Sequence, residues 1–234
     1  VEDGLRPDTL RDALSSGRLP NHQRLLAGAT EYTNARTVFP SVTLPANASL
    51  ITGRFPSEHG IPGNHWFNAE ANEEVDYMTP LSMACVYGFT LFEGRKCAGG
   101  LANSHLLVPA IYETLTAANL TSFVSFHPYW RGATRFRSPT ILEALSFWDG
   151  QDIKYDVLDR RMMAHAIDLL QSEGQPNLFT LYFAGTDGTA HEAGLAAEAD
   201  YLADVVDPLI GHFLDTLDSI RPGWRDDTKI ILTS

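Results

Sequence analysis

Residues that can do chemistry gather in three short segments of the chain. The first is residues 3–8 (DGLRPD), and the second is residues 39–64, which contain the runs FPSVTLP, TGRFP and HGIPGN. The third is residues 186–191 (TDGTAH). Carboxylates, imidazole and hydroxyl groups bind metal ions and act as nucleophiles in proteins. The three segments are therefore the candidates for a functional site.

The third segment places a carboxylate and an imidazole four positions apart. Asp187 and His191 follow an apolar run at 178–184 (LFTLYFA), which is typical of a strand buried on both faces. A turn at the end of a strand can direct both side chains at one cation, and this donor pair suits zinc or a similar transition metal. On spacing alone, a solvated pair in a loop is the simpler interpretation.

The second segment places a hydroxyl at the start of a predicted helix. Thr43 precedes residues 44–52, which have a short helical pattern. Backbone N–H groups and the helix dipole favour negative charge at such a position. Threonine becomes a nucleophile when a metal ion lowers the pKa of its hydroxyl. As an isolated observation, a threonine at this position is more often a simple N-cap residue.

The elements that must position these residues alternate between helices and apolar strands. The predicted helices cover 7–27 (broken at Gly17 and Pro20), 44–52, 109–118, 156–171 and 202–220, and the predicted strands cover 122–126, 178–184 and 229–233. Pro208 lies inside the last helix and is expected to kink or split it. This alternation predicts an α/β fold, with a mainly parallel sheet and helices on both faces. Such sheets carry their sites at the carboxyl ends of the strands.

Composition limits the class of protein. The chain has 234 residues, of which 44% are hydrophobic and 20% charged, and these values predict a single globular domain over 1–234. The formal net charge of −12 argues against a scaffold that binds nucleic acid through a basic face. No apolar run approaches the roughly 20 residues that a membrane span needs. No signal peptide is visible.

Taken together, the three segments resemble the type I phosphodiesterase and nucleotide pyrophosphatase family of the alkaline phosphatase superfamily. The ordered runs FPSVTLP, TGRFP and HGIPGN carry most of this resemblance. The resemblance implies an alkaline phosphatase-like fold. It also implies metal-dependent hydrolysis of phosphodiester or nucleotide pyrophosphate bonds in a small-molecule substrate.

The resemblance also implies a role for individual residues. Asp3 matches an aspartate that binds one of two divalent metal ions, which are expected to be zinc. Thr43 matches the nucleophile, which touches the same metal and becomes a phosphothreonine. Asn64 matches an asparagine that donates to a phosphoryl oxygen. Asp187 and His191 match two ligands of the second metal.

Three further ligands of the family are expected beyond Ser234. They are an Asp-His pair in an Asp-His-Gly step and a later histidine. The chain is therefore expected to be an incomplete catalytic domain, truncated at both ends. The piece by itself is expected to be inactive or nearly so, because two protein ligands per metal are too few for tight zinc binding.

Residues 126–132 (FHPYWRG) follow a predicted strand and have two interpretations. Tyr129 or Trp130 can stack on a base or an aryl leaving group, and Arg131 can reach a phosphate. Ordinary packing is the alternative. His59, in the HGIPGN run, is expected to be structural.

The compartment and the cysteines leave alternatives open. Cys85 and Cys97 can form a loop disulfide in an oxidising compartment or remain free thiols. An extracytoplasmic location is favoured over a cytoplasmic one.

Other functions within and outside this enzyme class also stay open. Hydrolysis of a phosphonoacetate-type C–P bond or of a phosphomonoester is possible in the same superfamily. A non-catalytic binding protein that keeps the fold is the alternative from a different class.

Overall fold

The computed structural model describes residues 1–89, 99–148 and 152–234, which form two compact units. The first unit contains Val1–Tyr32, Leu145–Gln175 and Leu181–Ser234, and the second contains Thr33–Ala144 and Pro176–Thr180. Cys97 lies outside the described residues, so its pairing stays a prediction. Across the described ranges, the helices are too short or too polar for any of them to cross a membrane.

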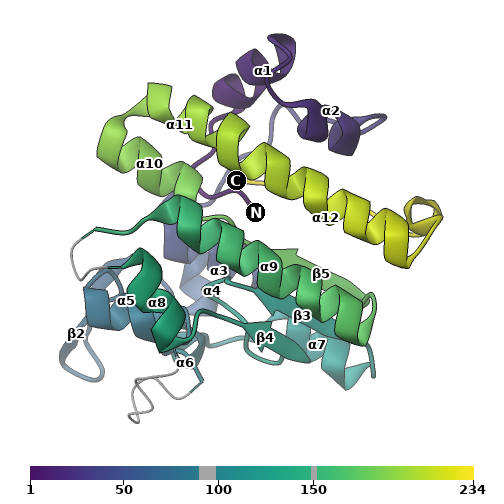
Figure 1. The fold of residues 1–234 in the computed structure, drawn as a ribbon. Coiled ribbons are helices and arrows are strands. Elements are labelled where there is room, and N and C mark those ends of the chain that lie inside the picture. The colour runs from purple at the N-terminus through teal and green to yellow at the C-terminus, as the bar shows by residue number, and fades with distance from the viewer. Residues whose placement is uncertain (90–98, 149–151) are drawn as a thin grey trace. The chain divides into compact units, whose positions relative to one another are not determined.

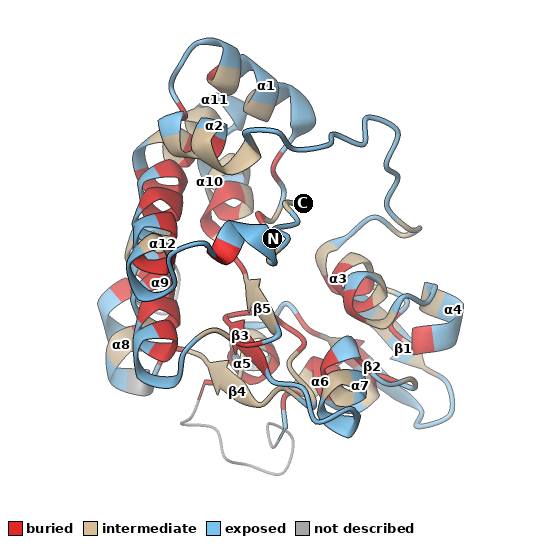
Figure 2. Ribbon diagram, turned by 90° about the vertical axis from the view of Figure 1, so that its right-hand side faces the viewer, coloured by how far each residue is buried: buried red, intermediate tan, exposed pale blue. Residues whose placement is uncertain are grey.

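The first unit is mainly helical (Figure 1). Its elements are α1 (Pro7–Ser15), α2 (Pro20–Leu26), α9 (Tyr155–Glu173), α10 (Gly185–Ala193), α11 (Leu195–Tyr201), the π-helical η1 (Leu202–Val206), α12 (Asp207–Ile220) and the short 3₁₀ helix η2 (Trp224–Asp226). Helix α9 packs against α12 and α10, and a stripe of buried residues runs along it (Figure 2).

Extended backbone at the beginning of the chain lies between two other segments of the first unit. Phe183 donates its N–H to the Val1 carbonyl at 3.0 Å, and its own carbonyl accepts from Asp3 at 3.1 Å. On the other side, the Glu2 N–H donates to the Thr233 carbonyl at 2.9 Å. The pairing of Glu2 with Phe183 is parallel, so Asp3 lies at the carboxyl-terminal end of this extended segment.

Pro208 divides the long helical segment as expected. Residues 202–206 form the π-helical η1, and α12 begins at Asp207 with Pro208 in its first turn. Proline has no N–H to donate, so a regular α-helix would lack a hydrogen bond at this position. The backbone adopts the π-helical hydrogen-bonding pattern just before it. The prediction of a buried strand at 229–233 is wrong: these residues form no strand, and Ile230 and Ile231 are exposed.

The second unit combines a small sheet with several short helices. Its elements are α3 (Thr43–Thr52), α4 (Pro56–His59), the hairpin strands β1 (His65–Asn68) and β2 (Glu73–Asp76), α5 (Pro80–Val86), α6 (Leu101–His105), α7 (Ile111–Ala117), β3 (Ser122–Ser125), β4 (Arg135–Arg137), α8 (Ile141–Phe147, which continues into the first unit) and β5 (Leu178–Leu181, whose last residue does the same).

The sheet of the second unit has the order β4-β3-β5, and β3 pairs with β4 in parallel. All four residues of β3 are buried, as expected for a central strand covered on both faces. Phe126, directly after β3, has a φ of +54°, and its N–H donates to the Arg137 carbonyl at 3.0 Å. The predicted α/β class with parallel strands is confirmed.

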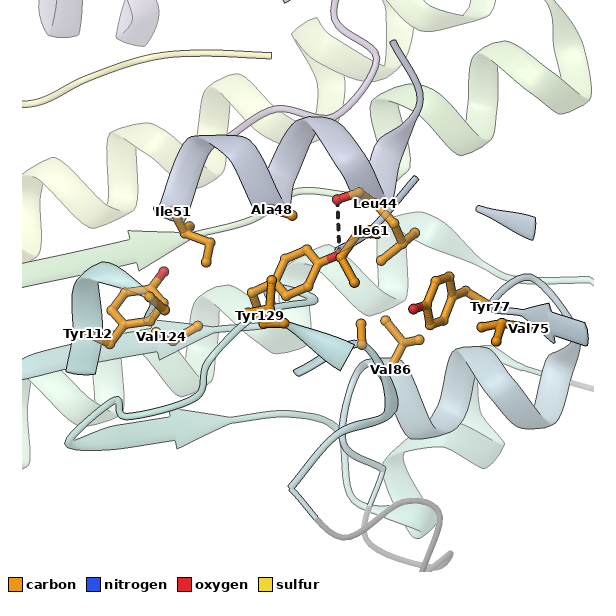
Figure 3. Close-up of a cluster of buried hydrophobic side chains, with 13 residues drawn as sticks. Leu44, Ala48, Ile51, Ile61, Val75, Tyr77, Val86, Tyr112, Val124 and Tyr129 are labelled. Atoms are coloured by element: carbon orange, nitrogen blue, oxygen red, sulfur yellow. Dashed lines mark hydrogen bonds between the residues drawn. The ribbon is translucent and has the colours of Figure 1, made fainter. Parts of the chain in front are cut away.

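Helix α3 forms one wall of the core of the second unit (Figure 3). Leu44, Ala48 and Ile51 recur at helical spacing, so they share one face of α3 and are all buried. Opposite them lie Tyr112 of α7 and Tyr129 from the connection between β3 and β4. The packing of this face fixes how α3 is oriented within its unit, and with it the direction in which the Thr43 end points.

Candidate functional site

Within the first unit, the backbone after Asp3 approaches Asp187 closely. Gly4 has a φ of +68°, and a Cβ at this position would lie 2.5 Å from Asp187 Oδ1 and 2.9 Å from its Cα. Contacts this short are not tolerated, so glycine is required both by the space and by the backbone conformation. The structure therefore brings together two of the three acidic and imidazole residues selected from the sequence.

The carboxylate of Asp3 is held by a tyrosine that the sequence did not point to. The Tyr182 hydroxyl donates to Asp3 Oδ2 at 2.5 Å. Burial raises the pKa of Asp3 to about 6, the hydrogen bond from Tyr182 opposes this shift, and the nearby charge of Asp187 adds to it. Two neighbouring carboxylates, one of them desolvated, repel each other and favour a bound cation.

His191 lies one helical turn after Asp187 in α10, so the two side chains emerge on the same side. His191 Nε2 is 3.5 Å from Asp187 Oδ1. The histidine side chain is 79% exposed, whereas that of Asp187 is 34% exposed. Both side chains can therefore contact a cation that arrives from solvent.

A buried aspartate in α9 holds the beginning of α10. Asp159 accepts hydrogen bonds from the N–H groups of Ala184 at 3.2 Å and Gly185 at 3.1 Å, and from the Tyr201 hydroxyl at 2.9 Å. These N–H groups belong to the first turn of a helix, where no carbonyl of the same helix can accept from them. Burial raises the pKa of Asp159 to about 7, and the three donors oppose that shift.

The donor chemistry of Asp3, Asp187 and His191 fits a divalent metal ion. Two carboxylate groups and one imidazole are ligands that zinc accepts, and the desolvated Asp3 gains from a positive charge beside it. Among the residues that the structure describes, however, no three His, Cys, Asp or Glu side chains are close enough together to hold a metal by themselves. The three residues therefore fit a metal site in chemistry but do not form a complete one.

In the second unit, Thr43 and Asn64 come together at the beginning of α3. Thr43 is the first residue of the helix, and Val42 occupies the N-cap position that the sequence analysis gave to Thr43. The Leu44 N–H donates to Asn64 Oδ1 at 2.9 Å. Because the amide oxygen of Asn64 accepts from Leu44, the amide NH₂ group of Asn64 points away from the Leu44 N–H.

His59 holds the loop that leads to Asn64. The Ile61 N–H donates to His59 Nδ1 at 3.1 Å, so the ring proton lies on Nε2, which is 3.0 Å from Ser49 Oγ in α3. Burial lowers the pKa of His59, which keeps the ring neutral. These contacts give His59 the structural role that was expected.

Tyr129 and Arg131 make contacts within the protein. Tyr129 is fully buried, and its hydroxyl donates to the Leu44 carbonyl at 3.0 Å (Figure 3). The Arg131 guanidinium donates to Glu113 Oε2 at 3.0 Å and also to backbone carbonyls at 103, 106 and 108. These contacts favour a structural role for both, and a role in substrate binding stays a prediction.

Trp130, between them, stacks on Phe136 with ring centroids 4.2 Å apart. Stacking between two protein rings is the packing alternative considered for this segment. A contact of Trp130 with substrate is likewise a prediction.

Four residues of the two units were missed by the sequence analysis: Asn47, His127, Asp159 and Tyr182. Asp159 left a signal, because it lies on the apolar stripe of α9 where a carboxylate needs partners. The sequence around the other three gives no sign of these contacts, and only the folded structure shows what their polar atoms contact.

The family model described as "Type I phosphodiesterase / nucleotide pyrophosphatase" matches residues 1–234. Ectonucleotide pyrophosphatase/phosphodiesterase family member 1 of Mus musculus is 23% identical over 236 residues, which cover 92% of this chain and 21% of that protein.

Solved structures show the same fold. Murine ectonucleotide pyrophosphatase/phosphodiesterase 5 has a TM-score of 0.65 at 19% identity, covering 94% of this chain and 52% of that one. An inactive threonine-to-alanine variant of the same murine protein, in complex with AMP, has a TM-score of 0.61 at 18% identity over 87% and 48% of the two chains.

Phosphonoacetate hydrolase from Sinorhizobium meliloti 1021, in complex with phosphonoacetate, has a TM-score of 0.58 at 18% identity over 94% and 52% of the two chains. The chain thus spans about half the length of these structures and about a fifth of the curated relative. These likenesses confirm the predicted alkaline phosphatase-like α/β fold. The match of the family model over 1–234 shows that the chain belongs to the type I phosphodiesterase / nucleotide pyrophosphatase family.

Proposed function

We propose that this protein hydrolyses phosphodiester or nucleotide pyrophosphate bonds, with Thr43 as the nucleophile. The observation that carries the proposal is the arrangement at the beginning of α3. Thr43 is the first residue of the helix there, and the adjacent Leu44 N–H fixes the amide of Asn64 beside it. A hydroxyl, a helix N-terminus and an oriented amide donor together suit attack on a phosphoryl group.

In the proposed reaction, the Thr43 oxygen attacks phosphorus while the bond from phosphorus to the leaving oxygen breaks. The hydroxyl proton is lost to solvent, and a phosphothreonine forms. The side-chain N–H groups of Asn64 donate to a non-bridging oxygen as its negative charge increases. Water then attacks phosphorus, and the bond to Thr43 breaks to restore the hydroxyl.

We also propose that Asp3, Asp187 and His191 contribute ligands to two divalent metal ions, most simply zinc. When bound, such ions lower the pKa of the attacking hydroxyl and neutralise charge on the phosphoryl oxygens. Tyr182 keeps the carboxylate of Asp3 oriented, and Asp159 keeps the first turn of α10 in place for Asp187. Removal of metal with a chelator is expected to abolish hydrolysis, and zinc is expected to restore it.

The substrate is proposed to be a small molecule with a nucleotide or aryl group. Curated relatives are called ectonucleotide pyrophosphatases/phosphodiesterases, and one solved relative holds AMP. The same names support an extracytoplasmic location. The net charge of −12 opposes long-range attraction of an anionic substrate, so the local charge of bound metal ions has to provide its binding energy.

The test replaces one of two threonines at opposite ends of α3. Thr43→Ala removes the proposed nucleophile, and Thr52→Ala removes a hydroxyl that donates only to the Ala48 carbonyl at 2.7 Å. Hydrolysis of bis(p-nitrophenyl) phosphate by the full-length protein is expected to fall at least about 10³-fold for Thr43→Ala and to change less than about threefold for Thr52→Ala. Equal effects of the two substitutions would exclude Thr43 as the nucleophile.

A substrate panel separates the alternatives. Faster release of p-nitrophenol from p-nitrophenyl phosphate than from the diester would indicate a phosphomonoesterase. Release of acetate from phosphonoacetate would indicate C–P hydrolysis. Metal binding without turnover of any of these compounds would indicate a non-catalytic member of the fold.

A further inference from the structure

We infer that Asn47, His127 and Tyr129 form a positioning network that holds the first turn of α3 and thereby orients the Thr43 hydroxyl. The inference rests on the proposed function, because it assigns these residues to the same nucleophile. None of the three is proposed to touch substrate. All three are buried, with at most 5% of each residue exposed.

The network contacts the two carbonyl groups at the very beginning of the helix. Asn47 Nδ2 donates to the Thr43 carbonyl at 2.9 Å, and the Tyr129 hydroxyl donates to the Leu44 carbonyl at 3.0 Å. Each carbonyl oxygen has two lone pairs, so it can accept from a side chain as well as from its own helix. First turns of helices fray, and a second donor on each carbonyl opposes this.

His127 fixes the orientation of Asn47. Because Asn47 Nδ2 donates to Thr43, its Oδ1 must accept, and His127 Nε2 lies 3.0 Å from that oxygen. Nε2 of His127 therefore carries a proton, and Nδ1 faces the backbone of Tyr129, 3.1 Å from its N–H and 2.9 Å from its carbonyl oxygen. Burial lowers the pKa of His127 to about 3, so this neutral form persists at all physiological pH values.

The segment that contributes His127 and Tyr129 is itself held at both ends. At its start, Phe126 adopts a φ of +54°, which a bulky residue rarely adopts, and its ring stacks on Tyr87 with centroids 4.5 Å apart. At its end, Arg131 is bound by Glu113 and by backbone carbonyls. Unfavourable backbone conformations of this kind persist where the surrounding structure imposes them, often at functional sites.

These contacts connect the end of β3 to the nucleophile. The strained turn after β3 directs His127 and Tyr129 toward α3, and these side chains hold the carbonyls of residues 43 and 44. The Leu44 N–H, in the same turn, holds Asn64. Loss of one donor is therefore expected to misalign the attacking oxygen and the amide together, with little change in substrate affinity.

The protein offers a matched control for Tyr129. Tyr112 is also fully buried in the same core, and its hydroxyl donates to Thr180 Oγ1 of β5 at 2.9 Å rather than to a carbonyl of α3. Tyr129→Phe and Tyr112→Phe each remove one buried hydroxyl and its hydrogen bond. Both should lower the melting temperature by a similar amount, about 2–4 °C.

The readout is the division of the kinetic effect between kcat and KM for bis(p-nitrophenyl) phosphate, measured on the metal-loaded full-length protein. Tyr129→Phe is expected to lower kcat about tenfold with KM within twofold of wild type, because a small misalignment affects the attack and not binding. Tyr112→Phe is expected to leave both within twofold. Equal effects of the two variants on kcat would overturn the inference.

A second pair of variants decides the question if Tyr129→Phe fails to fold. The amide of glutamine can replace the Nε2 donor of histidine, so His127→Gln should restore most of the kcat that His127→Met loses. Equal kcat values for these two variants would overturn the inference.

Failure of the proposed function has a separate signature. If Thr43→Ala retains turnover, Thr43 is not the nucleophile and the proposed function itself fails. If Thr43→Ala is inactive but Tyr129→Phe has the wild-type kcat, only the positioning network is refuted.

Discussion

The close approach of Gly4 to Asp187 makes a sharp prediction for Gly4→Ala. The added Cβ would lie 2.5 Å from Asp187 Oδ1, 2.8 Å from its Cβ and 2.9 Å from its Cα. The Oδ1 atom could rotate away, but the Cα belongs to the backbone of α10. The variant can therefore fold only if the backbone after Asp3 or the beginning of α10 shifts.

Gly17 provides the control, because it has a similar φ of +73° but nothing within 4 Å of an added Cβ. Gly17→Ala should lose about 1 kcal/mol of unfolding free energy, the penalty of placing an L-residue in a left-handed conformation. Gly4→Ala should lose the same amount plus about 1–3 kcal/mol for overpacking, which gives about 2–4 kcal/mol in total. The expected difference between the variants is thus about 1–3 kcal/mol.

Urea unfolding of both variants measures this difference, and competition with a chelating dye measures zinc affinity. Zinc binding by Gly4→Ala should weaken about tenfold or more, since the shift displaces Asp187 relative to Asp3, whereas Gly17→Ala should bind as wild type does. Equal losses of stability in the two variants would show that the approach is not as close as described. Unchanged zinc affinity in a destabilised Gly4→Ala would show that Asp3 and Asp187 do not share a metal-binding region.

Two further substitutions test other contacts. Burial raises the pKa of Asp159 to about 7, so the folded state holds a proton that the unfolded state releases near pH 4, and the unfolding free energy should fall as pH rises from about 4 to about 7. Asp159→Asn should flatten this part of the pH profile by up to about 1.4 kcal/mol per pH unit, and an unchanged slope in urea unfolding would contradict the assignment. Arg131→Met should lower the unfolding free energy by about 1–3 kcal/mol and leave KM unchanged, because its donors go to Glu113 and to backbone carbonyls. A raised KM at wild-type stability would instead place Arg131 in substrate binding.

Periodicity predicted the long elements well. Helix α9 follows the expected segment, and Pro208 divides the helical pattern near residue 207 because a missing N–H acts locally. The strand predicted from the apolar run 178–184 was too long, since β5 ends at Leu181. Tyr182 and Phe183 are buried beyond the end of β5, and Phe183 forms only an isolated bridge with Glu2; hydrophobicity alone does not distinguish such residues from those of a strand.

The residues selected from the sequence fall into two groups in the structure. Asp3 and Asp187 approach each other in the first unit, and Asn64 docks beside Thr43 in the second. The runs FPSVTLP, TGRFP and HGIPGN, in this order along the chain, led to the prediction of these residues. The assignment of metal ions and of the phosphothreonine to these groups remains a prediction.

What could not be predicted was the use of buried polar side chains. Tyr129 was singled out as a ring that can stack on substrate, yet its hydroxyl binds a carbonyl of α3. Asn47 lies in an Asn-Ala-Ser sequence that resembles a glycosylation site, but its amide is buried and bonded to Thr43 and His127. The contact of Asn47 with His127 and that of Tyr129 with Leu44 join residues 80 and 85 positions apart, and local patterns carry no information about partners at that distance.

The pairing of residues 1–3 has a consequence for how the protein is made. Val1 is hydrogen-bonded to Leu181, a separation of 180 positions, and Glu2 is bonded to Thr233. On a ribosome, the segment bearing Asp3 emerges long before either neighbour exists, and contacts over such separations form slowly. The segment that bears Asp3 should therefore be among the last parts of the first unit to reach its folded position, so its contacts cannot guide early folding.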